Sequence, residues 1–219
     1  FLEFAVASIC WGRGLSINYL NLNFINSNFA NIELSIVLSF FITTFFIVGF
    51  INAFNWWDGL DGLATGTAII STSFLFLINI TLYKFMPSYS SFLIASFLGS
   101  LLGFLKYNFK PAKILMGDGG AYFIGFYISH LILLNNFQVQ GKLEGDLYQN
   151  YSPLLTIIVV LPILVDMLKV IYLRLISLKL LFKPDRLHLH HDLLKIGLSE
   201  KETVIQMYSI VLFSCSFSF

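Results

Sequence analysis

The residues of this chain best suited to chemistry stand in three short polar clusters between long apolar runs. The first cluster, residues 52–63, holds two carboxylates, Asp58 and Asp61, each followed by a glycine, and two amides, Asn52 and Asn55. If the segment is helical, the carboxylates are i,i+3 neighbours that can meet the same cation, and the glycines let a ligand approach the backbone closely. A magnesium or metal-phosphate site and an acidic turn that caps the next helix both fit this pattern.

The second cluster ends in Gly-Asp-Gly-Gly at residues 117–120, directly before another apolar run. The free N–H groups of a helix N-terminus attract anions, and Gly119 and Gly120 leave room there for a phosphate or a metal-phosphate. Positive charge is added upstream by Lys106, Lys110 and Lys113. The alternative is that Asp118 is an N-cap and that the lysines mark the edge of the membrane.

The third cluster, residues 183–191, is basic and gathers three of the four histidines of the chain. These histidines are His188, His190 and His191. Arg186 offers a bidentate fork to phosphate oxygens, and an imidazole can donate a hydrogen bond through either ring nitrogen. A pocket for phosphate oxygens fits better than zinc, because no cysteine lies nearby and a carboxylate ligand would have to come from another loop. A solvated basic loop is the alternative without a function.

Apolar residues make up 57% of the 219 residues and charged residues only 11%, and the apolar residues come in long uninterrupted runs. Such runs predict helices that cross ~30 Å of hydrocarbon. We expect spans at residues 34–54, 64–83, 91–107, 120–136, 153–175 and 203–219, after a partial helix at residues 1–11. The predicted fold is all-α: one polytopic transmembrane helical bundle over residues 1–219, with about seven segments. We expect the first segment to be the remainder of a truncated helix; for the last segment a complete span and a truncated one both fit.

The distribution of lysine and arginine predicts the orientation of these spans. Ten of the 13 basic residues fall in or beside the loops that carry the three clusters, whereas Arg13, Lys84 and Lys142 fall on the opposite side. By the positive-inside rule the clusters face the cytoplasm. They thus share one face of the membrane, which a random scatter of turn residues would not produce. The net charge of +1 gives no indication of a nucleic-acid partner.

Reactive side chains also lie inside the apolar runs. Asp166 has Lys169 at i+3, which predicts a structural ion pair, with a part in the site as the alternative because intramembrane acids are often functional. His130 is expected to be a packed, hydrogen-bonded core residue. A polar pathway through these groups would make the chain a transporter or channel, but it would leave the three clusters unexplained. Cys10 and Cys215 are expected to be free thiols.

Together the three clusters resemble those of the polyprenyl-phosphate N-acetylhexosamine-1-phosphate transferases, in the same order. The matching stretches are Asn-Ala-Phe-Asn-x-x-Asp-Gly-Leu-Asp-Gly-Leu at 52–63, Ala-Lys-Ile-Leu-Met-Gly-Asp-x-Gly at 112–120 and Pro-Asp-Arg-x-His-x-His-His at 184–191. The third stretch is more similar to the branch that uses UDP-GlcNAc or related UDP-sugars than to the phospho-MurNAc-pentapeptide transferase branch. The resemblance covers nearly the whole chain.

The resemblance implies an enzyme that transfers HexNAc-1-phosphate from a UDP-sugar to polyprenyl (undecaprenyl) phosphate and releases UMP. This step initiates the lipid intermediates of cell-wall, O-antigen and other surface-glycan synthesis, at the cytoplasmic face of the bacterial inner membrane. The implied cofactor is Mg²⁺, with Mn²⁺ as a substitute. The implied partners are UDP-HexNAc, polyprenyl phosphate, the lipid bilayer and, in a homodimer, a second copy.

The family pattern implies three overlapping groups of site residues. The metal is assigned to Asn55 and Asp118. The catalytic centre is assigned to Asp58, Asp61, Asp118, His188, His190 and His191. Contacts with the substrates are assigned to Asn52, Asn55, Lys113, Gly119, Gly120 and Arg186.

The chain departs from the family pattern at two places. Family members usually carry an earlier Asp-Asp motif, and nothing before Asn52 matches it, since Glu3 and Glu33 are the only acidic residues there. Family chains also have further N-terminal spans, so we expect this chain to be the C-terminal part of a longer one and inactive alone. A relative that merely binds lipid or nucleotide is the alternative. Ala121 stands where the family often has serine, which removes a hydroxyl but leaves the helix N–H groups.

Overall fold

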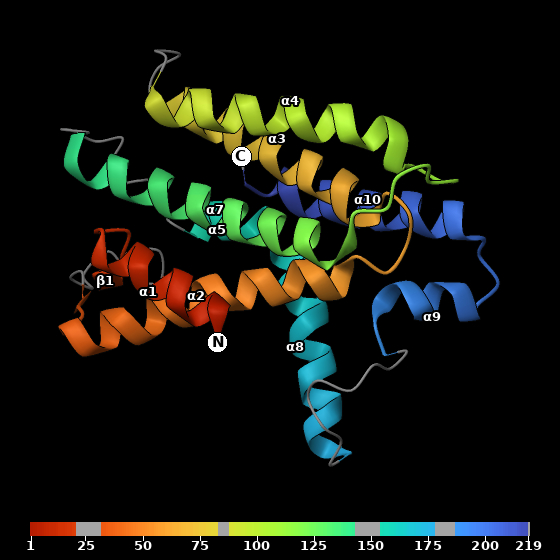
Figure 1. Cartoon of the computed structure of the whole chain (residues 1–219), viewed down its shortest axis with the longest axis horizontal. Helices are drawn as coiled ribbons and strands as arrows, with labels where there is room; N and C mark the ends of the chain where they lie inside the picture. Colours follow the sequence, from red (N-terminus) through yellow and green to blue (C-terminus); the bar gives the residue numbers. More distant parts are fainter. Residues whose placement is uncertain (21–31, 83–87, 143–153, 178–186, 219) are drawn as a thin grey trace.

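The computed structural model describes residues 1–20, 32–82, 88–142, 154–177 and 187–218, and within them the chain is almost entirely helical (Figure 1). The helices are α1 (Leu2–Gly12), α2 (Ile36–Trp57), α3 (Leu63–Leu82), α4 (Tyr89–Asn108), α5 (Gly117–Lys142), α7 (Leu154–Ile158), α8 (Leu161–Ile176), α9 (Leu189–Lys195) and α10 (Glu200–Ser216). The strands β1 (Tyr19–Leu20) and β2 (Ile32–Glu33) form one short antiparallel pair. The expected all-α fold is confirmed.

Three of the described helices are long and apolar enough to cross a membrane: α2, α3 over Leu63–Thr81, and α4. The expected number of seven spans is therefore not confirmed. Side-chain caps define where two of these helices begin. Ser35 accepts a hydrogen bond from the backbone N–H of Leu38 at the start of α2, and Ser88 and Ser91 form a reciprocal capping box at the start of α4.

Small residues allow the helices of the bundle to approach closely. A Cβ atom on Gly125 of α5 would stand 2.5 Å from the carbonyl oxygen of Phe50 in α2, so the two backbones touch there. Buried hydrogen bonds hold α3 to α4, from Asn79 Nδ2 to Ser90 Oγ (2.7 Å) and from Thr65 Oγ1 to Asn108 Oδ1 (2.7 Å). These contacts fix the ends of α2, α3 and α5, which carry the first two polar clusters.

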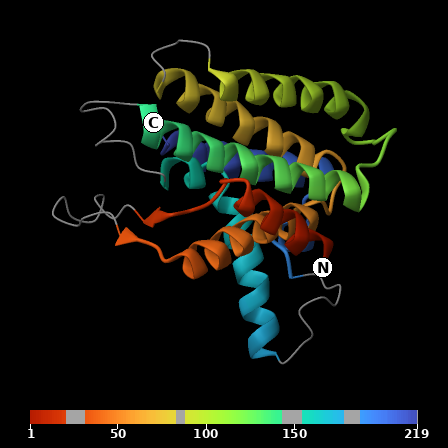
Figure 2. The ribbon, with the colours of Figure 1, turned by 60° about the vertical axis from the view of Figure 1, so that its left-hand side comes forward.

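The predicted single span at residues 153–175 is wrong. The chain there forms two helices, α7 and α8, separated at Val159 and Val160, and Pro162 in the first turn of α8 suits a new helix start. Figures 1 and 2 both show α8 running across the direction of the other long helices and away from them. Its outer positions are apolar and exposed, while Asp166 and Arg174 are buried. This break carries α8 toward α9 and the third cluster.

Cys10 and Cys215 are free, as expected. His130 of α5 packs against the rings of Phe126 and Tyr127, as a core residue should. The expected hydrogen bond is missing at Nδ1, which is buried and has no partner in the described part of the chain.

Candidate active site

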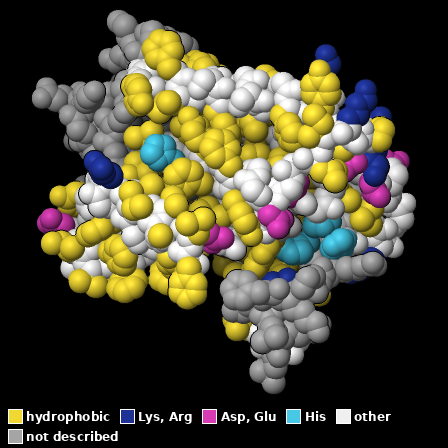
Figure 3. Space-filling model, viewed as in Figure 1, with side chains coloured by type: hydrophobic (Ala, Val, Ile, Leu, Met, Phe, Trp, Pro, Cys, Tyr) yellow, Lys and Arg dark blue, Asp and Glu magenta, His cyan; other side chains and the backbone are white. Residues whose placement is uncertain are grey.

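The segments that carry the three polar clusters lie at the same end of the bundle. Figure 1 places the turn after α2, the connection between α4 and α5, and α9 together at one end. On the surface of that end, histidine side chains form one patch with acidic side chains beside it (Figure 3). The sequence-based prediction that the clusters share one side is therefore confirmed for the described residues.

The first cluster is a turn rather than a continuation of the helix. Because α2 ends at Trp57 and α3 begins at Leu63, Asp58 and Asp61 do not occupy i,i+3 positions on a helix. Gly62 has a φ of +79°, a left-handed conformation that glycine adopts without strain, and its carbonyl oxygen accepts a hydrogen bond from the Tyr208 hydroxyl of α10 (2.6 Å). A hydrogen bond from α10 thus fixes the turn between α2 and α3.

The second cluster meets the first at two points. Asn55 Nδ2, in the last turn of α2, donates to Asp118 Oδ1 in the first turn of α5 (3.1 Å). Asp61 Oδ2 accepts from the backbone N–H of Ala112 (3.1 Å) and lies 3.6 Å from Lys110 Nζ. Lys110 also pairs with Glu200 of α10.

These contacts leave Asp58 in an unfavourable environment for a carboxylate. Burial, together with the nearby charges of Asp118 and Asp61, raises the pKa of Asp58 to about 6. Three acidic side chains at this end of the bundle therefore repel one another unless something positive lies between them.

The third cluster meets the first at a glycine. A Cβ atom on Gly59 would stand 2.3 Å from His190 Nε2, so the imidazole lies directly against the backbone between the two aspartates. His190 is only 1% exposed, and neither of its ring nitrogens has a hydrogen-bond partner in the described residues. Burial, with a smaller contribution from the neighbouring imidazoles of His191 and His188, lowers its pKa to about 4. An unbonded buried imidazole costs roughly 1–3 kcal/mol, which a ligand would recover.

His188 is bound on one side by an acid. Its Nδ1 lies 2.8 Å from Asp166 Oδ2 of α8, and both side chains are buried. The expected ion pair between Asp166 and Lys169 is wrong, because Lys169 Nζ instead lies 2.7 Å from Asp192 Oδ2 of α9. The i+3 spacing places both side chains on one face of α8, but they do not pair with each other. Asp166 binds His188 of the third cluster, and Lys169 binds Asp192 of α9.

The other residues predicted for the site differ in their contacts and in their exposure to solvent. Asn52 Nδ2 donates to Glu3 Oε2 of α1 (2.7 Å) and to the carbonyl oxygen of Val48 (2.9 Å). His191 packs against His190 with ring centroids 4.2 Å apart. The side chain of Lys113 is exposed. Arg186 lies outside the described residues.

The two glycines that follow Asp118 differ in the space around them. A Cβ atom on Gly119 would meet nothing within 4 Å, whereas one on Gly120 would stand 2.6 Å from Met116 Cγ. Open space beside Gly119 leaves the backbone of the first turn of α5 accessible to a ligand, whereas Met116 fills the space beside Gly120, so the expected room exists at only one of these two glycines.

The acidic side chains fit a hard divalent cation. In the described part of the chain no three His, Cys, Asp or Glu side chains are arranged to hold a metal alone. Mg²⁺ does not require such a group, because it keeps several waters and binds one or two carboxylates together with substrate phosphates. Asp58 and Asp118 offer carboxylate oxygens, and the Asn55 amide, turned over, would direct its oxygen to the same place. Added positive charge would also relieve the repulsion that raises the pKa of Asp58.

Sequence reasoning missed three residues that support the site. Glu3 accepts a hydrogen bond from Asn52, and Tyr208 donates one to the Gly62 carbonyl oxygen. The centroid of the Trp56 ring lies 4.7 Å from the Arg174 guanidinium carbon and 6.0 Å from the centroid of the His188 ring. The rarity of an acid in an apolar helix could have singled out Glu3. The sequence gives no comparable reason to single out Trp56 and Tyr208, because aromatic residues are common throughout the chain.

Sequence comparisons relate this chain to known proteins. The family model described as glycosyl transferase family 4 matches residues 1–136. A probable undecaprenyl-phosphate N-acetylglucosaminyl 1-phosphate transferase of Bacillus subtilis is 37% identical over 163 residues, 74% of this chain and 42% of the relative. A decaprenyl-phosphate N-acetylglucosaminephosphotransferase of Mycobacterium leprae is 33% identical over 172 residues, again 74% and 42%.

A phospho-N-acetylmuramoyl-pentapeptide-transferase of Clostridium acetobutylicum is 33% identical over 164 residues, 75% of this chain and 46% of the relative. The chain therefore spans less than half the length of these curated relatives. The matched region includes the first two clusters, whose residues meet at the end of the bundle. The chain belongs to glycosyl transferase family 4 and is a polytopic membrane protein.

Proposed function

We propose that the full-length protein transfers HexNAc-1-phosphate from a UDP-HexNAc to polyprenyl phosphate. The UDP-HexNAc is UDP-GlcNAc or a related UDP-sugar. An oxygen of the lipid phosphate attacks the β-phosphorus of the UDP-sugar. The bond from that phosphorus to the oxygen shared with the α-phosphate breaks, and UMP leaves with the oxygen. The product is a polyprenyl-diphospho-sugar.

The contact between Gly59 and His190 is the observation that carries this proposal. It brings a group of imidazoles, which can bind phosphate oxygens, against a turn of carboxylates, which can bind a cation. Both substrates are anionic, so a site for them must offset the repulsion between their phosphates. The site also lies at the end of membrane-length helices, where a lipid phosphate at the bilayer surface can reach it.

Each group of site residues has a proposed role that follows from its chemistry. Mg²⁺, or Mn²⁺ in its place, held by Asp118 and Asn55 would neutralise the diphosphate when bound. Asp58 and Asp61 would hold the metal-nucleotide site, and Asp58 would offer a further carboxylate oxygen beside the cation. The imidazoles of His188, His190 and His191 donate to phosphate oxygens and stabilise negative charge on the leaving UMP. The excess of lysine and arginine in the loops on this side of the bundle supports a position at the cytoplasmic face of a bacterial inner membrane.

The test measures UMP release from UDP-GlcNAc in membranes that contain the full-length protein and undecaprenyl phosphate, with and without Mg²⁺. Release should require both the lipid and the cation, and it should collapse in Asp118→Asn. The matched control is Glu33→Gln in β2, the strand paired with β1 at the end of the bundle opposite to α9 (Figure 1), and it should retain activity. No release with any UDP-HexNAc from a folded, membrane-inserted protein would refute the transferase and favour a relative that only binds.

A further inference from the structure

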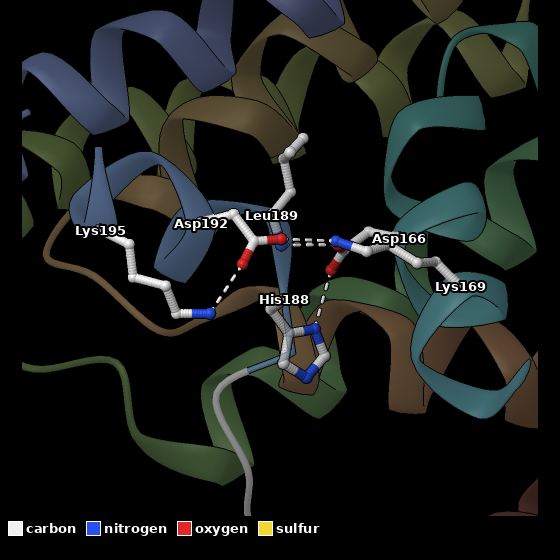
Figure 4. Close-up of polar contacts among 6 residues, drawn as sticks. All are labelled: Asp166, Lys169, His188, Leu189, Asp192 and Lys195. Carbon is white, nitrogen blue, oxygen red and sulfur yellow. Dashed lines mark hydrogen bonds and ion pairs between the residues drawn. The ribbon is translucent and has the colours of Figure 1, made fainter. Parts of the chain in front are cut away.

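Asp166 is a buried carboxylate with two defined partners. Its Oδ2 accepts from Nδ1 of His188 and its Oδ1 accepts from the backbone N–H of Leu189, both at 2.8 Å (Figure 4). Only 4% of Asp166 is exposed, so water does not compete for these bonds. One side chain of α8 therefore fixes both the imidazole and the first residue of α9.

A second contact joins the same two helices and provides a comparison. One turn farther along α8, Lys169 pairs with Asp192 of α9, which also binds Lys195 (2.9 Å). These three side chains are more than a third exposed, whereas the pair of Asp166 and His188 is buried. Both contacts dock α9 on α8, but only the buried one acts on a ring of the candidate site.

A carboxylate at Nδ1 decides which nitrogen of a histidine can act on a ligand. Because a carboxylate accepts hydrogen bonds, Nδ1 of His188 carries a hydrogen, and Nε2 becomes the nitrogen that a phosphate or a transferable proton can meet. In the described residues Nε2 has no hydrogen-bond partner. The ring is held further by His190, stacked at 5.7 Å with 10° between the planes, and by Trp56 at 6.0 Å.

We propose that Asp166 is a positioning residue for the reaction: it fixes the tautomer and the orientation of His188 so that Nε2 meets the transferred phosphoryl group. This inference rests on the proposed function. In Asp166→Asn the side chain offers one acceptor oxygen to two donors. If its oxygen keeps the N–H of Leu189, its NH₂ group faces Nδ1 and forces the hydrogen onto Nε2. The fold can survive such a change, but His188 then presents the opposite tautomer.

The kinetic test compares Asp166→Asn, His188→Gln and the double variant in the full-length protein, with Lys169→Gln as the control that breaks the exposed contact. Asp166→Asn should lower kcat roughly 10- to 100-fold, the range for loss of one charge-assisted hydrogen bond, with KM for UDP-GlcNAc changed by less than about threefold. The double variant should be no slower than His188→Gln, because both changes remove one function. Lys169→Gln should stay close to wild type.

Two results would overturn the proposal. If Lys169→Gln loses as much kcat as Asp166→Asn, the acid merely docks α9. If the effects of Asp166→Asn and His188→Gln multiply, they act independently. An inactive wild type would instead refute the proposed function. In that case nitrogen-15 NMR of labelled histidine, with His188→Gln for assignment, still decides: the Nδ1–H tautomer should reverse in Asp166→Asn, and an unchanged tautomer would overturn the proposal.

Discussion

Gly59→Ala tests the contact that joins the first and third clusters. The new methyl group would stand 2.3 Å from Nε2 and 2.6 Å from Cε1 of His190. Since an ordinary contact is about 3.5 Å, the ring edge must retreat by about 1.2 Å. His190 is buried between two other imidazoles and cannot swing into solvent. We expect a loss of stability of about 1–3 kcal/mol and, because a reacting group moves by about 1 Å, roughly a 100-fold loss of kcat.

The assay is UMP release together with thermal unfolding of the purified protein. Gly103→Ala in α4 is the matched control, because its Cβ would meet nothing within 4 Å. His190→Ala removes the overlap, so adding Gly59→Ala to it should cost little further stability. If Gly59→Ala keeps kcat within about twofold of the control, then the working enzyme does not hold His190 against the turn, and the site described above is wrong.

Three further outcomes follow from the geometry. Tyr208→Phe should lower the stability by about 1–3 kcal/mol in thermal unfolding, since it leaves the buried Gly62 carbonyl without its donor. Folding raises the pKa of Asp58 from its ordinary 3.8 to about 6, so without divalent cations stability should fall as pH rises from about 4 to 6. After allowance for partial exposure the change is roughly 1–2 kcal/mol, and Asp58→Asn should flatten the unfolding-against-pH curve; an unchanged curve contradicts the shift. Glu3→Ala should slow UMP release roughly tenfold because Asn52 loses its acceptor, whereas Glu3→Gln should retain most activity; equal losses in both would mean that charge matters instead.

The sequence predicted the parts of the site that depend on composition and local spacing. Long apolar runs are sufficient to predict helices, and the bias of lysine and arginine is sufficient to group the loops. It failed where an interaction is decided by packing between distant segments. Nothing near Asp166 in the sequence shows that His188, more than 20 residues on, is its partner rather than Lys169.

The prediction of a single span at residues 153–175 failed for a different reason. The run at 153–175 has the composition of one span, but Pro162 is placed where a new helix can begin, and buried Asp166 and Arg174 must face protein rather than lipid. These requirements are met when α8 separates from α7 and turns across the bundle. Apolar composition limits where such a segment can lie but does not determine its direction.

The contact between Gly59 and His190 also bears on how the protein is made. A membrane protein enters the bilayer as it is synthesised, beginning at the N-terminus, so α2 to α5 are in place while the third cluster is still being translated. The acidic turn then has neither its imidazole neighbours nor the Tyr208 hydroxyl of α10. The candidate site is consequently incomplete until α10, the last described helix, docks on α3, and an error of insertion that misplaces α10 leaves the acidic turn without the Tyr208 hydroxyl.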